Sequence, residues 1–294
     1  MRWERDVSRG AWLADRVAAA AGDMHVAVPI GFEAYARVFH PVTADRLTGI
    51  SWTELADSGE SWPGDRVETR TAAWAEVAAE SGATVHPLMQ WSAIGGGRLT
   101  ELPQVGTVGD SGWRYSAPEW GRPGAELVAT LARTLAGHTA TPTAGVAAVW
   151  EGWGGLFGQG RRYLTFLSDD ATDAPAPPSI VVPEPALGPE VQHGPRLALP
   201  WREHVLFDAG IDEFADADWP ERALWVAEPT WPECPSLIWP DDHAWVIVSE
   251  IDWDSTVVAG SRAAIDAVLE ASGIEALEIS ERADLSSNGD TVNR

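Results

Sequence analysis

The chain contains no lysine, because all 20 of its basic residues are arginine, and these are outnumbered by 44 aspartates and glutamates. The absence of lysine excludes a Walker-type phosphate loop, Schiff-base chemistry and a lysine general base. A formal net charge of −24 argues against nucleic acid as a partner, because binding to a phosphate backbone needs clustered positive charge. We therefore expect no nucleic-acid partner.

Cysteine and long apolar runs are also scarce. Cys234 is the only cysteine, so the chain can form no internal disulfide and cannot alone build a zinc site from cysteines. Residues 1–22 carry charges among their apolar positions and lack the apolar core of a signal peptide. The sequence contains no run of about 18 apolar residues, so we expect no membrane span. These absences predict a cytoplasmic protein with no membrane partner.

Tryptophan is abundant, with 17 residues against nine phenylalanines and tyrosines together, in a chain that is 45% hydrophobic and 22% charged. This composition predicts a globular protein with a sizeable core. Tryptophan is rarely fully buried and is enriched at interfaces. The surplus therefore indicates either loops anchored on the core or a tryptophan-lined recognition surface.

Periodicity and helix-ending residues predict secondary structure along most of the chain. The predicted helices span residues 8–21, 71–81, 124–137 and 261–272. The predicted strands span residues 25–29, 35–41, 84–91, 145–150, 161–167, 196–208, 244–251, 256–258 and 275–279. Several strands follow one another through short links and not through helices. This order predicts an α+β fold, with a mainly antiparallel sheet and a few packed helices.

Composition also suggests how the chain is divided. Residues 1–168 form an N-terminal α+β part, and residues 169–195, with seven prolines, are expected to be a surface loop or linker. Residues 196–280 form a C-terminal α+β part that we expect to pack with the first as one domain. The polar residues 281–294 are predicted to be a disordered tail.

An acidic motif follows the apolar run of residues 246–248. If the strand continues, Glu250, Asp252 and Asp254 share one face at two-residue spacing. That face is either simply solvated or a site for a divalent cation such as Mg²⁺ or Ca²⁺, and we expect no other cofactor. Residues 241–243, which include His243, would join this site if the chain turns back at Pro240.

The same segment resembles the signature of haloacid dehalogenase-type phosphatases, in which an apolar strand precedes Asp-x-Asp-x-Thr. The resemblance implies Asp252 as nucleophile and Asp254 as acid/base, with magnesium. Only residues 257–294 follow Thr256, and the family's lysine is absent. A metal-assisted hydrolase, phosphatase- or esterase-like, using Asp252, Asp254 and His243 is therefore an alternative function, and no catalytic set is assigned.

Two further groups are candidates for ligand binding. Residues 150–162 combine tryptophan, glycine and a rare positive pair, and they form either a long hairpin turn or a ligand loop; its candidate residues are Trp150, Glu151, Trp153, Arg161 and Arg162. The other candidates lie at strand ends, where side chains can converge at one sheet edge; they are His40, His86 and Trp91.

Several segments resemble a family of uncharacterised proteins from high-GC actinobacteria. They are residues 28–41, 86–91, 150–154, 237–242 and 250–256. The resemblance implies a cytoplasmic actinobacterial protein and transfers no catalytic residue. Our leading hypothesis from the sequence is an acidic, tryptophan-rich binding or regulatory protein without catalysis, which takes a protein partner or a small-molecule ligand.

Overall fold

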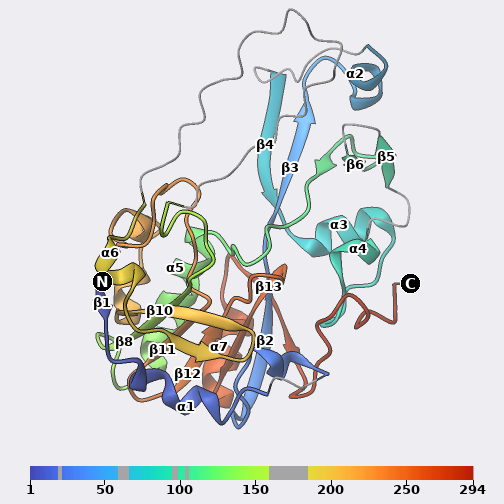
Figure 1. The fold of residues 1–294 in the computed structure, drawn as a ribbon. Helices are drawn as coiled ribbons and strands as arrows, with labels where there is room; N and C mark the ends of the chain where they lie inside the picture. The colour runs from blue at the N-terminus through green and yellow to red at the C-terminus, as the bar shows by residue number, and fades with distance from the viewer. Residues whose placement is uncertain (19–21, 59–65, 95–98, 103–105, 159–184, 294) are drawn as a thin grey trace, which may run out of the picture.

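The computed structural model describes residues 1–18, 22–58, 66–94, 99–102, 106–158 and 185–293 (Figure 1). These residues form two sheets in which all the paired strands run antiparallel, with helices packed around them. The predicted α+β class with a mainly antiparallel sheet is therefore confirmed.

The larger sheet holds nine strands. In spatial order they are β1 (Arg2–Glu4), β10 (Arg202–Asp208), β8 (Gly145–Trp150), β11 (Leu237–Pro240), β12 (Trp245–Val248), β13 (Ser255–Gly260), β2 (Ala34–Phe39) and β14 (Glu275–Ile279), with β9 (Leu197–Leu199) paired to β10. Strands from the N-terminal part (β1, β8 and β2) lie between strands from the C-terminal part or pair with them, so residues 169–195 do not separate two independent sheets.

The smaller sheet holds five strands. In spatial order they are β4 (Val67–Ala72), β3 (Val42–Leu47), β7 (Arg114–Tyr115), β6 (Gly106–Val108) and β5 (Thr100–Leu102). In Figure 1, β2 leads almost directly into β3, so the chain passes from the large sheet into the small one along one line. Helix α2 (Trp52–Ser58) packs against this sheet through Trp52 and Leu55.

Both faces of the large sheet are covered. On one face pack α5 (Ala125–Leu135), α7 (Arg262–Glu270) and the 3-10 helices η4 (Ala136–His138), η5 (Ile211–Phe214) and η6 (Trp219–Glu221). The other face packs against the N-terminal elements η1 (Val7–Gly10), α1 (Ala11–Ala14) and η2 (Met24–Val26). Five tryptophans are fully buried in the cores: Trp74, Trp219, Trp225, Trp239 and Trp245.

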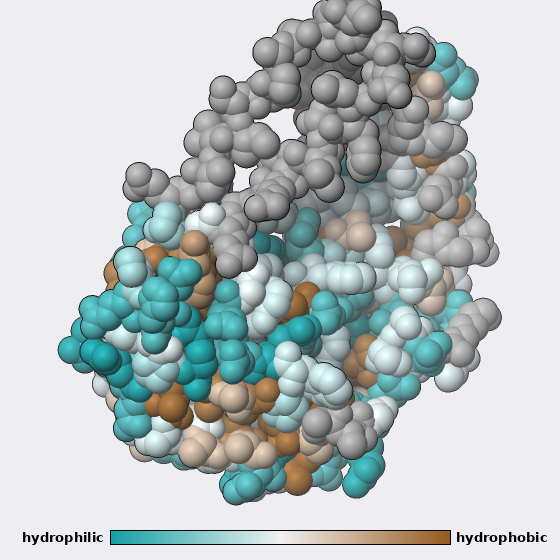
Figure 2. All heavy atoms as spheres, in the orientation of Figure 1, coloured by the Kyte–Doolittle hydropathy of each residue, from teal (hydrophilic) through white to brown (hydrophobic). Residues whose placement is uncertain are grey.

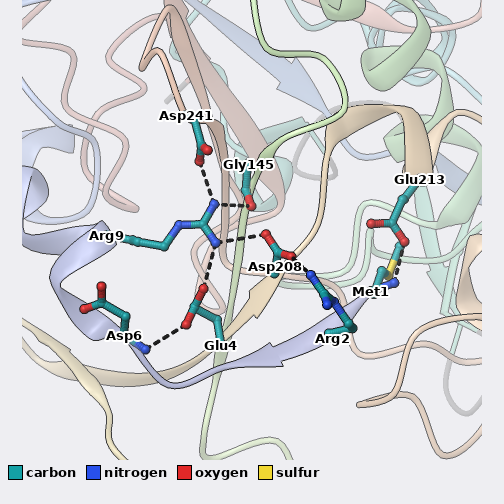
Figure 3. Close-up of polar contacts among 9 residues, drawn as sticks. All are labelled: Met1, Arg2, Glu4, Asp6, Arg9, Gly145, Asp208, Glu213 and Asp241. Carbon is teal, nitrogen blue, oxygen red and sulfur yellow. Dashed lines mark hydrogen bonds and ion pairs between the residues drawn. The ribbon is translucent and has the colours of Figure 1, made fainter.

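A partly buried arginine network fixes the N-terminal segment to the large sheet (Figure 3). The guanidinium of Arg9 donates to Glu4 and Asp208 at 2.9 Å each and to Asp241 at 2.6 Å. It also donates to the carbonyl of Gly145 at 3.0 Å, on β8. One cation thus links β1, β10, β8 and the turn after β11, and this explains why the N-terminal helices cover that face.

A second arginine, which is almost fully buried, joins the large sheet to the loop before α4 (Trp91–Ile94). Arg37 on β2 is 1% exposed and donates to Asp254 at 3.0 Å and to Ser255 at 2.8 Å. It also donates to the carbonyls of Pro87 and Met89. Its guanidinium carbon lies 4.7 Å from the ring centre of Phe39 and 5.7 Å from that of Trp74, in the core beside the small sheet.

Several predicted elements are confirmed with small changes at their ends. The helices at α3 (Trp74–Ser81), α5 and α7 form as expected, with Gly82 in the left-handed conformation after α3 and the Ser261 side chain capping α7. The strands predicted at residues 145–150 and 275–279 match β8 and β14.

Two strand predictions are wrong. Residues 25–29 overlap the 3-10 helix η2, because the Asp23 side chain accepts the backbone N–H of His25 and caps a turn. Residues 84–91 form a loop that leads into α4 (Trp91–Ile94), because the N–H of Gln90 bonds to Asp290 and not to a neighbouring strand.

The prediction of a disordered tail is also wrong for the described residues 281–293. The carbonyl of Ala283 accepts the N–H of Met24 at 2.9 Å, and Leu285 is buried against the large sheet. Asp290 is 1% exposed and bonds to His86 at 2.9 Å. The buried Leu285 and Asp290 therefore hold residues 281–293 against the rest of the protein. The polar composition of this segment did not indicate these contacts.

Of the predicted linker, residues 169–195, the structure describes only residues 185–195. The strand predicted at residues 161–167 and residues 169–184 of the linker lie outside the described residues. Residues 185–195 pack on the core: Leu187 is buried, its N–H bonds to the carbonyl of Leu156, and α6 (Pro189–Gln192) follows.

The surface is dominated by polar side chains on the side of β10. Figure 2 shows hydrophilic residues over α6 and β10, whereas hydrophobic residues gather around α1. None of the helices in the described ranges is long and apolar enough to cross a membrane.

Replacing Arg37 tests its role as the connection between the large sheet and the loop before α4. Arg37→Leu leaves the Asp254 carboxylate buried without its cation, so the free energy of unfolding should fall by about 3–5 kcal/mol in chemical denaturation. Arg2→Leu is the matched control, because Arg2 is exposed and pairs with Asp208 at the surface. An equal loss in the two variants would contradict the assigned role.

Candidate functional site

The acidic motif lies in a turn and not in a strand. β12 ends at Val248, which pairs with Val257, and β13 begins at Ser255. Residues 249–254 therefore form the tip of a hairpin, closed by the N–H of Trp253 bonding to the carbonyl of Glu250. The prediction that Glu250, Asp252 and Asp254 share one strand face is wrong, because the strand stops before them.

Two arginines neutralise these carboxylates. Arg202 at the start of β10 donates to Glu250 at 2.9 Å and to Asp252 at 2.6 Å, and Arg37 donates to Asp254. Within the described residues, no group of three or more histidine, cysteine, aspartate or glutamate side chains could hold a metal ion. The structure therefore gives no support to the divalent-cation site expected from the sequence.

His243 and its neighbours lie at the other end of β12 and cannot join this turn. Asp241 pairs with Arg9, and Asp242 accepts the N–H of Ala140. His243 stacks on Trp12 with ring centres 4.4 Å apart, and burial lowers its pKa. The expected convergence of residues 241–243 with the acidic motif is wrong, because a full strand separates them.

The described part of the candidate ligand loop, residues 150–158, is held by contacts within the protein. Trp150 lies beneath the Arg202 guanidinium at 5.2 Å and meets Trp153 edge to face at 5.7 Å. Glu151 pairs with Arg196 at 2.9 Å. A cavity of about 340 Å³ lies beside Glu151 and Trp153. Arg161 and Arg162 lie outside the described residues.

His40 has a structural place. It is fully buried, with Nδ1–H donating to the carbonyl of Glu119 at 2.9 Å and Nε2 accepting the hydroxyl of Thr256 at 2.9 Å. Thr256 in turn accepts the hydroxyl of Ser249 at 2.8 Å. Burial lowers the pKa of His40 to about 4, so the ring is neutral at neutral pH. No ligand can reach a ring so enclosed, which corrects its assignment as a binding residue.

His86 is committed to the C-terminal segment. Its Nε2 lies 2.9 Å from Asp290, whose carboxylate also accepts N–H groups of Gln90, Val292 and Asn293. Burial alone would raise the pKa of Asp290, but the hydrogen bonds from Asn293 and its neighbours lower it to about 2. The carboxylate therefore stays ionised and holds the segment to the loop before α4.

A cavity of about 450 Å³ lies between α4, the hairpin tip and the C-terminal segment. We call it the tryptophan pocket, because three tryptophans and two aspartates give it its chemical character: Trp91, Trp120, Trp253, Asp252 and Asp254. The remaining lining residues are Gln90, Ser92, Ala117, Leu285, Ser286 and Ser287. Of the candidates predicted from the sequence, Trp91, Asp252 and Asp254 meet here.

The pocket combines exposed aromatic faces with negative charge. Trp120 is 61% exposed, and the side chain of Asp252 is 64% exposed. Burial raises the pKa of Asp254, and Arg37 behind it opposes that shift. The described lining holds two carboxylates and no basic side chain. Such a site suits a cation that aromatic rings can cover.

Gly121 brings Trp120 to the hairpin tip. Its N–H bonds to the carbonyl of Trp253 at 2.8 Å, and its φ is +64°. A Cβ at this position would lie 2.5 Å from the Cα of Ile251. Only glycine permits both the left-handed conformation and this close approach. Sequence reasoning missed Trp120 because this contact joins segments about 130 residues apart. The neighbouring Gly121 was the one local feature that could have indicated a close approach of the backbone.

In comparisons with protein families, curated proteins and solved structures, the chain has no significant match. The function must therefore be argued from the site.

Gly121→Ala should separate Trp120 from the hairpin tip. A left-handed alanine that also collides with backbone should cost about 2 kcal/mol in chemical denaturation. Gly137→Ala is the matched control, because no atom lies within 4 Å of the added Cβ and its φ is not positive. Equal stability of the two variants would show that the contact with Ile251 is not required.

The buried ring of His40 should make stability sensitive to acid. Its pKa is about 4 when folded and 6.5 ordinarily, so on acidification the unfolded chain takes up the proton first. The resulting stability is complete above pH 6.5 and is lost as the pH falls through about 4, a change of about 3 kcal/mol.

Denaturation at a series of pH values tests this assignment. Between pH 6.5 and 4, His40→Gln should lose about 3 kcal/mol less stability than the parent protein. His193→Gln, at an exposed position, should follow the parent protein. If His40→Gln shows the same acid loss as the parent, the assignment is wrong.

Proposed function

We propose that this protein is a binding protein without catalysis, and that its tryptophan pocket takes an arginine side chain of a basic partner protein. The observation that carries the proposal is the lining of one cavity by Trp91, Trp120, Trp253 and two aspartates with no basic side chain. A guanidinium group stacks on aromatic rings and also donates to carboxylates.

The charge of the whole chain supports the same kind of partner. A net charge of −24 attracts a basic protein over a distance and accelerates association. An anionic ligand would meet both this field and the two local carboxylates, so it is disfavoured. Trp120, 61% exposed beside the opening, offers the large aromatic surface typical of interface residues.

The alternative from the sequence, a metal-assisted hydrolase, has weaker support. Glu250 and Asp252 each face Arg202, and Asp254 faces Arg37. A divalent cation takes about six or more oxygen ligands, and among the described residues no three histidine, cysteine, aspartate or glutamate side chains lie together to supply them.

The proposed setting is the cytoplasm. Cys234 is buried, and burial raises the pKa of its thiol to about 12, so it is unreactive. A chain that cannot form an internal disulfide suits a reducing compartment.

The experiment compares two peptides that differ only in charge. Acetyl-Gly-Arg-Gly-amide carries the guanidinium, and the citrulline analogue has nearly the same shape without the charge. Nuclear magnetic resonance would follow the indole N–H signals during titration at physiological salt. We expect saturable shifts with the arginine peptide alone.

Variants locate the binding. Trp120→Ala should weaken binding about tenfold, because a cation–π contact contributes about 1–2 kcal/mol. Trp201→Gly is the matched control, because Trp201 is 75% exposed but lies outside this pocket. Equal binding of the two peptides, or equal loss in the two variants, would refute the proposal.

A further inference from the structure

A second pocket lies on the other side of the hairpin tip and shares Asp252 and Trp253 with the tryptophan pocket. It has an outer cavity of about 370 Å³, lined by Val26, Ala27, Pro200, Trp201, Arg202, Glu250, Asp252 and Trp253. Five of these residues also line an inner chamber, so the two spaces adjoin: Val26, Ala27, Pro200, Arg202 and Glu250. We call the whole the serine–histidine pocket.

The inner chamber is small and mostly apolar. Its volume is about 20 Å³, enough for one hydroxyl group or one water molecule. Its apolar walls are Val17, Val26, Ala27, Leu199, Pro200, Leu237 and Val248. The chamber is also lined by His204 on β10 and by Ser236, the residue before β11.

Two polar atoms of this chamber are unsatisfied. His204 is 2% exposed and Ser236 is 3% exposed. Neither Nδ1 of His204 nor Oγ of Ser236 has a hydrogen-bond partner among the described residues. Buried polar atoms normally bond to protein, water or a ligand, so two unpaired atoms on residues that line one cavity point to a bound group.

The protonation of His204 defines what that group must be. Burial lowers its pKa to about 4, so the ring is neutral. A hydrogen bond to the Leu197 backbone raises the pKa and so opposes the effect of burial. A hydrogen bond raises the pKa of histidine when the ring is the donor, so the ring donates to Leu197 through its other nitrogen, Nε2. Nδ1 therefore has a free lone pair and accepts, whereas the Ser236 hydroxyl can donate.

A hydroxyl group suits both atoms, because it can donate to His204 and can accept from Ser236. Arg202 and Glu250 also line the chamber but pair with each other, so a charged ammonium or carboxylate would lose its hydration without gaining an unpaired counter-ion. The low pKa also makes His204 a poor general base, so the pair is suited to binding and not to nucleophilic catalysis.

Trp201 at the rim has an unusual conformation. It follows Pro200 in the two-residue loop between β9 and β10, and its φ is +73°. Glycine is the residue usually found in this conformation, yet here it is adopted by a tryptophan that is 75% exposed. Because Trp201 is 75% exposed, its packing against the described residues is too limited to compensate for the strain, and a contact with a ligand would explain the choice of residue.

We propose that the serine–histidine pocket binds a neutral polyhydroxylated ligand such as a monosaccharide. One hydroxyl enters the chamber between His204 and Ser236, and an apolar C–H face of the ligand covers Trp201. Arg202 and Glu250, paired at 2.9 Å at the entrance, offer a donor and an acceptor to further hydroxyls. This proposal does not rest on the arginine site proposed above, although the two pockets share Asp252 and Trp253.

The test follows the ring nitrogens of isotope-labelled histidine by nuclear magnetic resonance. The His204 signal would be assigned with His204→Gln, and the protein titrated separately with glucose, galactose, mannose, myo-inositol and glycerol. We expect a saturable change at Nδ1 with at least one of them. If none changes the signal, the chamber holds water alone and the proposal is wrong.

Three variants separate binding from folding. Ser236→Ala should weaken binding about three- to tenfold, through the loss of one hydrogen bond. Trp201→Gly should weaken binding while raising the melting temperature, because glycine relieves the strained φ. Trp120→Ala should leave sugar binding unchanged. If Trp201→Gly binds as tightly as the parent protein, Trp201 is not the platform and the proposal fails.

Discussion

The burial of one arginine between the large sheet and the loop before α4 positions the parts of the molecule that form the proposed binding site. Arg37 lies in a core with Phe39 and Trp74, where an unpaired guanidinium could not stay. Its donors are satisfied by Asp254 and Ser255 on one side and by the carbonyls of Pro87 and Met89 on the other. These partners fix the hairpin tip against the loop before α4. Because both segments line the tryptophan pocket, the packing requirement of a single cation also positions the proposed binding site.

Two pockets of different chemistry then share the hairpin tip. The tryptophan pocket holds carboxylates and aromatic rings and is suited to a cation. The serine–histidine pocket ends in two neutral hydrogen-bonding atoms within apolar walls and is suited to a hydroxyl group. Arg202 accounts for the difference, because it pairs with Glu250 and Asp252 on its own side of the tip. Both faces of the large sheet are covered, and the two pockets lie beside the hairpin tip, where β12 ends and β13 begins.

Sequence reasoning succeeded where local patterns decide structure. The apolar stripe of α5, the Ser261 cap of α7 and the β-branched runs of β8 and β12 act over a few residues. It failed for β3 and β4, whose polar residues give no alternation, and for residues 84–91, whose apolar run is held in a loop by Asp290. The candidate site was found only in part. Trp91, Asp252 and Asp254 were predicted, but Trp120 and Arg202 reach the hairpin tip through contacts between distant segments, which no local pattern reveals.

The most direct test of the tryptophan pocket is a crystal structure of the protein with an arginine-containing peptide bound. The account predicts a guanidinium group within about 6 Å of the ring centre of Trp120 or Trp253, hydrogen-bonded to Asp252 or Asp254. Arg37 should remain paired with Asp254 in that complex. A peptide bound elsewhere on the acidic surface, with the three tryptophans uncovered, would contradict the account.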